Sequence, residues 1–327
     1  MRTFTHISAA TIDEACSLLR KYKGKAVLNA GGTDLLLTLK GEHLFEYPDA
    51  VIDIKTIDGL DSISENEDGL KIGALAKLSA ITRSPLVRNG YGALAEAALT
   101  VATPQIRNAG TIGGNLCQDV RCWYYRYPRH IGGPMTCLRK GKGPCLAVAG
   151  DNRYHAIIGG KKCFAVCPSD TAVALAAMDG KIRIASASGE RTIPVTGFFS
   201  PLGNGLKSGE MVTSVEVPKI KVTAKQTFLK FTLRKPVDFA IVSVASVILQ
   251  DKGVCVDARI ALGAVSPGPL RAEKAEETLK GKPITPESAA EAAEQALADA
   301  KPLSMNAYKV EIAKTLVKRA ILSDRES

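Results

Sequence analysis

Six of the eight cysteines in the chain are concentrated in one segment. Within residues 117–167 lie Cys117, Cys122, Cys137, Cys145, Cys163 and Cys167. No CxxC pair is present, so the usual spacing of a zinc ribbon is absent. Thiolates that a loop segment contributes suit an iron–sulfur cluster or a four-cysteine zinc site. A scattered set of free thiols is the alternative.

Two glycine pairs form a second candidate site. Ala30-Gly-Gly-Thr-Asp34 lies between a strand pattern and a helix pattern, and Thr111-Ile-Gly-Gly-Asn115 repeats this chemistry about 80 residues later. Backbone amides and a helix N-terminus in such a turn can hold an anionic phosphate. Neither pair is part of GxGxxG or GxxxxGK[ST], which disfavours a standard Rossmann site or P-loop. One pair alone is commonly a tight turn, but two together predict loops that grip one pyrophosphate.

Hydrophobic periodicity predicts the elements that position these residues. A capping box at Thr11 to Glu14 begins a helix that ends near Tyr22. Strands are predicted at 26–28, 50–54, 70–74 and 181–185, and helices at 35–39, 91–102 and 170–178. Residues 103–170 show little periodicity, which in a compact protein indicates function or disorder. The run Trp123-Tyr-Tyr125 argues against disorder.

The last third of the chain has a different pattern. Strands are predicted at 227–233, 241–249 and 254–262, with a hairpin at Asp251-Lys-Gly253, and helices at 271–279, 285–298 and 304–322. We therefore predict an α+β fold in three parts. These are an α/β subdomain at 1–58, a second subdomain at 59–222 with the cysteine-rich segment at about 119–163, and an α+β domain at 223–327.

Length and composition narrow the class of protein. The chain has 327 residues, of which 46% are hydrophobic and 23% charged, which excludes a disordered chain and suggests two or three domains. No apolar stretch approaches the roughly 20 residues of a membrane span. Asp13 and Glu14 stand where a signal peptide would be apolar, so we expect a cytoplasmic protein. Thiols are kept reduced in that compartment, which argues against a disulfide framework.

The positive charge of the chain is concentrated beside the cysteines. The formal net charge is +10, and residues 119–163 hold nine basic and two acidic residues, a net +7. A basic nucleic-acid-binding protein with a four-cysteine zinc site is one interpretation, but no recognised nucleic-acid motif is present. The placement beside the cysteines instead favours compensation for anionic groups that are bound there.

Three segments resemble a known family in order and spacing. Ala30 to Asp34, Thr103-Pro-Gln-Ile-Arg-Asn-Ala-Gly-Thr-Ile-Gly-Gly-Asn115 and Pro168-Ser-Asp170 are similar to the FAD-binding subunit of the molybdenum hydroxylases, the group of xanthine dehydrogenase, carbon monoxide dehydrogenase and hydroxybenzoyl-CoA reductase. Residues 228–240 resemble the start of the C-terminal domain of that family. The resemblance implies a two-part FAD-binding domain of the vanillyl-alcohol-oxidase-like (PCMH) type, followed by a C-terminal α+β domain with an antiparallel sheet and helices.

The resemblance also implies which residues bind FAD. The loops from Ala30 to Asp34 and from Thr111 to Asn115 would bind the pyrophosphate and ribityl chain. The full set of implied cofactor-binding residues in this part of the chain is Leu28, Ala30, Gly31, Gly32, Thr33, Asp34, Thr103, Ile106, Gly110, Thr111, Gly113, Gly114 and Asn115. Asp170 would contact adenosine or ribityl hydroxyls, although it could equally be a helix N-cap. Lys230 would lie near the isoalloxazine, with a solvated strand position as the alternative, and Arg234 is a weaker candidate. No catalytic residue is predicted on this chain.

The segment from Arg121 to Cys163 resembles an insertion that only some members possess. In hydroxybenzoyl-CoA reductase and certain aldehyde-oxidising members it carries a [4Fe-4S] cluster, and the matching positions are Cys122, Cys137, Cys145 and Cys163. Cys167 could compete as the fourth ligand, and similar loops can persist without a cluster. His130 and His155 lie in the same segment with no pattern that gives them a role.

The resemblance implies partner subunits. The chain shows no molybdopterin-type region and no ferredoxin-like run of cysteines, so it resembles one subunit of a heterotrimer, or of a dimer of heterotrimers, with a large molybdenum-cofactor subunit and a small [2Fe-2S] subunit. FAD would exchange electrons with NAD or another carrier. In a reductase-like variant, ferredoxin would feed the [4Fe-4S] cluster. A scaffold subunit without flavin is the remaining alternative.

Overall fold

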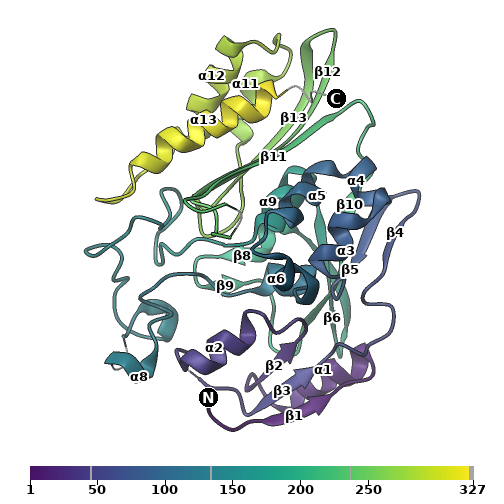
Figure 1. Ribbon diagram of the computed structural model, residues 1–327, viewed down its shortest axis with the longest axis vertical. Helices are drawn as coiled ribbons and strands as arrows, with labels where there is room; N and C mark the ends of the chain where they lie inside the picture. The colour runs from purple at the N-terminus through teal and green to yellow at the C-terminus, as the bar shows by residue number, and fades with distance from the viewer. Residues whose placement is uncertain (45, 133–134, 236, 324–327) are drawn as a thin grey trace.

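A computed structural model describes residues 1–44, 46–132, 135–235 and 237–323, and three main sheets follow one another along the chain (Figure 1). A three-stranded sheet forms one end of the molecule, a five-stranded sheet lies in the middle, and a four-stranded sheet under three helices forms the other end (Figure 1). The cysteine-rich segment, which contains α8 (Arg129–Gly132), emerges at one side. The predicted α+β fold is confirmed.

The first sheet is parallel and has the order β1-β3-β2. Its strands are β1 (Thr5–Ser8), β2 (Ala26–Asn29) and β3 (Ala50–Asp53). Helix α1 (Ile12–Lys21) begins as predicted, because the Thr11 hydroxyl accepts a hydrogen bond from the Glu14 amide at 3.1 Å. It packs Ala15, Cys16 and Leu19 into the core of this part. After β2 the chain turns through the first glycine pair into α2 (Leu35–Gly41).

The second sheet is antiparallel and has the order β4-β5-β10-β6-β7. Its strands are β4 (Ile63–Glu65), β5 (Gly69–Gly73), β6 (Lys181–Ser186), β7 (Gly189–Pro194) and β10 (Met211–Pro218). Sequence periodicity identified β5 and β6 but missed the central strand β10. Buried residues occupy both faces of β10, and its register shifts between Val212 and Ser214, so it lacks the simple alternation of a half-buried strand.

Two helices lie between the second and third sheets. They are α5 (Gly92–Leu99), which contacts β11, and α9 (Asp170–Ala177), which contacts β12 and β13. Every residue of α9 is buried, as expected for a helix that is covered all round. The neighbouring helices are α3 (Leu78–Arg83) and α4 (Pro85–Gly90). One hydrophobic core therefore joins the middle of the chain to the C-terminal sheet.

The C-terminal part follows the prediction closely. Its antiparallel sheet contains β11 (Lys225–Phe231), β12 (Val242–Asp251), β13 (Val254–Gly263) and β14 (Leu270–Arg271). Lys252 and Gly253 both have positive φ in the tight turn between β12 and β13, as a two-residue hairpin requires. The outer face is covered by α11 (Glu273–Leu279), α12 (Pro286–Ala296) and α13 (Tyr308–Leu322) (Figure 1). No described helix is long and apolar enough to cross a membrane.

The segment 103–170 contains more helix than periodicity indicated. Helices α6 (Pro104–Ala109) and α7 (Ile112–Cys117) each have six residues, too few to produce a periodic pattern. Their starts are fixed by Thr103 and Thr111, whose hydroxyls cap them. From 118 to 169, the described residues form only α8 and the 3₁₀ helix η1 (Leu138–Lys140). The small elements α10 (Val195–Phe198), β8 (Phe199–Ser200) and β9 (Gly203–Asn204) follow β7.

Candidate cofactor site

The first glycine loop packs against the backbone at Ala109 and Gly110, directly before the second glycine segment. A side chain on Gly31 would place its Cβ 2.2 Å from the carbonyl oxygen of Ala109, so only glycine permits this approach. Gly32 has a φ of +69°, a left-handed conformation that also favours glycine. In the second loop, the Thr111 hydroxyl accepts a hydrogen bond from the Gly114 amide at 3.1 Å. Backbone from two distant parts of the chain thus forms one surface.

A cavity of about 530 Å³, the first cavity, lies against this surface. Most of the residues predicted to bind FAD line it, namely Leu28, Ala30, Gly31, Gly32, Thr33, Asp34, Ile106, Gly110, Thr111, Gly114 and Asn115. Gly113 lines an adjacent cavity of about 320 Å³ instead. Thr103 lines neither, and its hydroxyl accepts a hydrogen bond from the Ile106 amide at 3.5 Å, the cap of α6.

A second cavity, of about 460 Å³, adjoins the first. Asp170, at the start of α9, lines it. The N-cap of α9 is Ser169 rather than Asp170, since the Ser169 hydroxyl accepts a hydrogen bond from the Ala172 amide at 3.1 Å. Arg234 also lines this cavity, and its guanidinium pairs with Asp238 at 2.7 Å.

Lys230 lines neither the first nor the second cavity, and it forms a buried ion pair with Asp170. The Lys230 Nζ atom is 2.7 Å from Asp170 Oδ2 and donates a second hydrogen bond to the Thr100 carbonyl at 2.9 Å. The two side chains are 6% and 5% exposed, so Lys230 is not a solvated strand residue. Burial raises the pKa of Asp170, and the ammonium group of Lys230 opposes that shift. The pair fixes β11 to the start of α9.

The cavities offer polar groups that the protein itself does not satisfy. Within the described residues, the buried Thr38 Oγ1 atom in the first cavity and the buried Ser243 Oγ atom in the second have no hydrogen-bond partner. Buried hydroxyls are normally paired, so a ligand with several polar groups along its length fits these walls. The first glycine loop adds backbone amides for an anionic pyrophosphate, whereas the amides of residues 112–115 donate within the protein. These residues therefore fit an extended dinucleotide such as FAD.

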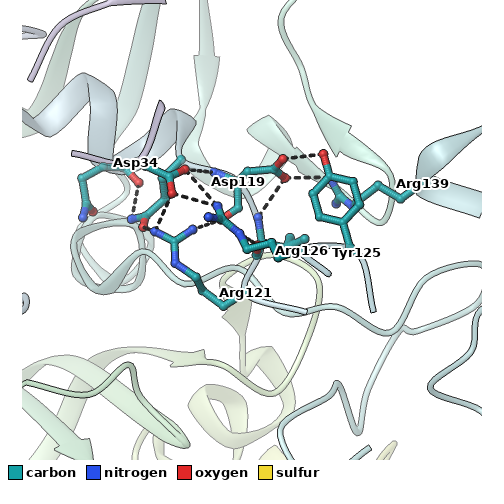
Figure 2. A network of polar contacts seen from close by, with 9 residues as sticks. Asp34, Asp119, Arg121, Tyr125, Arg126 and Arg139 are labelled. Atoms are coloured by element: carbon teal, nitrogen blue, oxygen red, sulfur yellow. Dashed lines mark hydrogen bonds and ion pairs between the residues drawn. The ribbon is translucent and has the colours of Figure 1, made fainter. Parts of the chain in front are cut away.

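Asp34 ends the first glycine loop and ties it to the cysteine-rich segment (Figure 2). Its Oδ1 atom lies 3.0 Å from Arg121 Nη2 and 2.8 Å from Arg126 Nη2. Its Oδ2 atom accepts a hydrogen bond from the Asp119 amide at 2.8 Å. The carboxylate predicted to serve FAD thus anchors residues 119–163, which we call the cysteine insertion.

Asp119 extends the same network toward the cysteines (Figure 2). The Tyr125 hydroxyl donates to its Oδ2 atom at 2.6 Å, and Arg139 Nη1 lies 3.3 Å from its Oδ1 atom. Burial and the Asp119 charge raise the pKa of Tyr125, so this phenol stays protonated and donates. Sequence reasoning missed this network, although one signal was present, since Asp119 is one of only two acidic residues among nine basic ones in the insertion.

The four cysteines predicted to bind a cluster surround one small cavity, the thiol cavity, of about 20 Å³. Cys122, Cys137, Cys145 and Cys163 all line it. Cys167 instead lines the first and second cavities. All eight cysteines are free of disulfide bonds. In the described part of the chain, no group of three or more His, Cys, Asp or Glu side chains is arranged to hold a single metal ion.

Several polar groups surround the sulfur of Cys122 at the thiol cavity. Burial raises the pKa of the Cys122 thiol to about 11, while amides of Tyr125 and Tyr124 that hydrogen-bond to the sulfur oppose this shift. His155 Nε2 lies 3.3 Å from Cys122 Sγ. Burial lowers the pKa of His155 to about 4, so the ring is neutral at pH 7. Hydrogen bonds to sulfur are among the means by which proteins tune iron–sulfur sites.

The C-terminal domain holds the other side of the insertion. Asn306 Nδ2 donates to the His155 carbonyl at 3.1 Å, and the fully buried Lys309 donates to the same carbonyl at 3.0 Å. Asn152 accepts a hydrogen bond from the Met305 amide at 2.9 Å. The insertion is therefore fixed at Asp34 on one side and at the start of α13 on the other.

Comparisons with known proteins identify the family of the chain. Residues 2–220 match the model of the FAD binding domain in molybdopterin dehydrogenase, and residues 227–323 match that of the CO dehydrogenase flavoprotein C-terminal domain. The aldehyde oxidoreductase FAD-binding subunit PaoB of Escherichia coli is 33% identical over 323 residues, covering 96% of each chain. The nicotinate dehydrogenase FAD-subunit of Eubacterium barkeri is 30% identical, covering 88% of this chain and 83% of that subunit.

Solved structures show the same fold. A carbon monoxide dehydrogenase from Hydrogenophaga pseudoflava superposes with a TM-score of 0.79 at 29% identity, covering 98% of this chain and 96% of that one. The quinoline 2-oxidoreductase of Pseudomonas putida 86 superposes with a TM-score of 0.77 at 25% identity, covering 98% and 96%. The similarity therefore extends over nearly the entire length of both chains.

Proposed function

Because this chain belongs to the family of FAD-binding medium subunits of molybdenum hydroxylases and carbon monoxide dehydrogenases, we propose that it transfers electrons within a three-subunit complex. The family makes it a subunit of an oxidoreductase. A large molybdenum-cofactor subunit and a small [2Fe-2S] subunit would be its partners, in a heterotrimer or a dimer of heterotrimers. The substrate would be bound by the large subunit. Bound FAD would accept electrons singly and release them as a pair.

The residues of this chain would bind and orient that flavin. The glycine loops at 30–34 and 111–115 would both bind the pyrophosphate, with free amides supplied by the first loop, since the amides of residues 112–115 donate within the protein. The first cavity, which residues of both loops line, supports this placement. Asp170 would accept hydrogen bonds from flavin hydroxyls in the second cavity, because Lys230 holds its carboxylate in place. Lys230 lines neither cavity, so it would act through its ion pair with Asp170.

Cys122, Cys137, Cys145 and Cys163 would hold a [4Fe-4S] cluster. The observation that carries this proposal is that the four thiols, which come from a segment of 42 residues without any CxxC spacing, line one cavity. Cys163 is favoured over Cys167 as the fourth ligand for the same reason. Lys140, whose ammonium interacts with Cys137 and Cys122, would compensate the negative charge of the site.

An external carrier would approach the cluster over a basic surface. Arg129, Lys142, Arg153, Lys161 and Lys162 are exposed on the insertion. This surface favours an acidic ferredoxin-like carrier, and NAD at the flavin is the alternative. In a reductase-like complex, electrons would enter from ferredoxin through the cluster. We also propose a cytoplasmic location and the three-part division at residues 58 and 222.

The complex purified with its partner subunits tests this function. We expect the purified complex to contain FAD, molybdenum and more iron than the [2Fe-2S] subunit accounts for. We also expect ferredoxin, supplied reduced as an electron donor or oxidised as an electron acceptor, to exchange electrons with the complex faster than NAD does. Raising the salt concentration should slow that exchange, because exposed charges are screened. A complex without flavin would refute the proposal. Exchange with NAD alone, unaffected by salt, would refute the ferredoxin part only.

A further inference from the structure

Arg121 lies where the two flavin cavities meet. Four residues line both cavities, namely Arg121, Cys167, Pro168 and Phe239. Arg121 is the only charged residue among them. It belongs to the cysteine insertion and directly precedes Cys122 in the chain. A cation from the insertion is therefore present where the two cavities that we assign to FAD meet.

The protein fixes the Arg121 guanidinium in this position. Its Nη2 atom donates to Gln118 Oε1 at 2.8 Å and lies 3.0 Å from Asp34 Oδ1, and its Nη1 atom donates to the Asp119 carbonyl. The guanidinium carbon lies 4.6 Å from the centre of the Phe239 ring, a cation–π distance. The side chain is 24% exposed. A guanidinium held on several sides loses little freedom when it donates to a ligand.

The local charges leave this cation incompletely neutralised. The network of Figure 2 contains the carboxylates of Asp34 and Asp119 and the guanidinium groups of Arg121, Arg126 and Arg139, an excess of one positive charge. Burial lowers the pKa of Arg121 to about 10, which still keeps it protonated at pH 7. Such an excess beside a cavity favours a ligand with anionic oxygens, as the pyrophosphate of FAD has.

We propose that Arg121 is a FAD-binding residue supplied by the cysteine insertion, and that its guanidinium donates to an oxygen of FAD at the junction of the two cavities. The insertion then forms one wall of the flavin site in addition to holding the four thiols. The inference rests on FAD binding by this chain and is independent of the proposed [4Fe-4S] cluster.

Arg126 provides a matched control for this proposal. It binds the same Asp34 carboxylate, at 2.8 Å, but lines neither flavin cavity. Loss of either arginine weakens the attachment of the insertion to Asp34, whereas loss of Arg121 alone would remove a contact with FAD. The experiment compares the FAD dissociation constants of Arg121→Gln and Arg126→Gln in the full chain with its partner subunits, after removal and titration of FAD.

We expect Arg121→Gln to raise the FAD dissociation constant at least tenfold, as loss of a charge-assisted hydrogen bond would. Arg126→Gln should raise it less than threefold. Arg121→Lys, which keeps the charge without the forked geometry, should fall between the two and serves if Arg121→Gln does not fold. Equal effects of Arg121→Gln and Arg126→Gln, or an unchanged constant in Arg121→Gln, would overturn the proposal. A wild-type complex that binds no FAD would instead refute the proposed function.

Discussion

The flavin cavities and the thiol cavity are built in different ways. The first glycine loop joins β2 to α2 and the second glycine pair lies in α7, and the backbone contact of Gly31 with Ala109 fixes the distance between the two segments. The cysteine insertion has only α8 and η1 in its described residues, and it is held by charged and polar side chains at Asp34, Asn152 and Lys309. One site therefore depends on backbone packing and the other on side-chain contacts. Substitutions at one site should therefore remove one cofactor and leave the other bound.

The largest effect is expected at the thiol cavity. Cys145→Ala should remove the cluster, so that the iron content falls by about four atoms per chain while FAD is retained. Elemental analysis and the visible absorption spectrum measure both cofactors. Cys255→Ala is the matched control, because Cys255 is buried in the core of the C-terminal domain and should leave the iron unchanged. Equal iron in both variants would contradict the assignment of the four ligands.

The reverse separation is expected at the glycine loops. Gly31→Ala would force a Cβ atom within 2.2 Å of the Ala109 carbonyl oxygen, so the two loops must move apart and FAD should be lost. We expect at least a tenfold rise in the FAD dissociation constant, measured by flavin fluorescence, with most of the iron retained. Gly90→Ala is the control, since a Cβ at that position meets no atom within 4 Å. Normal FAD binding by Gly31→Ala would show that the contact is dispensable.

Breaking the buried ion pair of Asp170 and Lys230 should lower the free energy of unfolding and leave the iron content unchanged. Lys230→Met leaves the Asp170 carboxylate buried without its partner, which costs about 3–5 kcal/mol of the free energy of unfolding. Chemical denaturation measures this loss. The exposed pair of Arg153 and Asp151 is the comparison, and Arg153→Met should change the stability little. Similar losses in the two variants would indicate that Asp170 and Lys230 do not depend on each other.

The smallest effect concerns His43, which packs against Tyr125 of the insertion with ring centres 5.3 Å apart. Burial lowers the pKa of His43 to about 4 from 6.5, so between these values the unfolded chain binds more protons than the folded one. The free energy of unfolding should therefore rise as the pH rises from 4 to 6.5, and His43 should add no slope above that range. His43→Gln should show a shallower rise when stability is measured at several pH values. If the slope of the free energy of unfolding against pH is the same in His43→Gln as in the wild type, the side chain of His43 is solvent-exposed rather than buried.

Many of the helices and strands can be predicted from the sequence. Regular elements with clear caps and turns, such as α1 after Thr11 and the hairpin at Lys252 and Gly253, are visible because local residue chemistry determines them. Strand β10 is not visible in the sequence, because it is buried on both faces and a register shift interrupts the alternation of its side chains. Helices α6 and α7 are too short to produce a periodic signal.

The candidate site shows the same limit. Glycine pairs and cysteines are visible as residue types, and most of them line the expected cavities. The partners of Asp34 are Arg121 and Arg126, 87 and 92 residues further along the chain, and no local pattern connects them. The positive charge of the insertion is apparent in the sequence, but its division into buried pairs and exposed cations depends on the tertiary structure.

We propose that this chain holds two redox cofactors, FAD in the first and second cavities and a [4Fe-4S] cluster in the thiol cavity. Electron paramagnetic resonance of the dithionite-reduced complex, compared between wild type and Cys145→Ala, tests it most directly. We predict a [4Fe-4S] signal in the wild type that is absent from Cys145→Ala, with equal FAD and equal [2Fe-2S] signals in both. A wild-type complex that contains FAD and shows only [2Fe-2S] signals would contradict the claim.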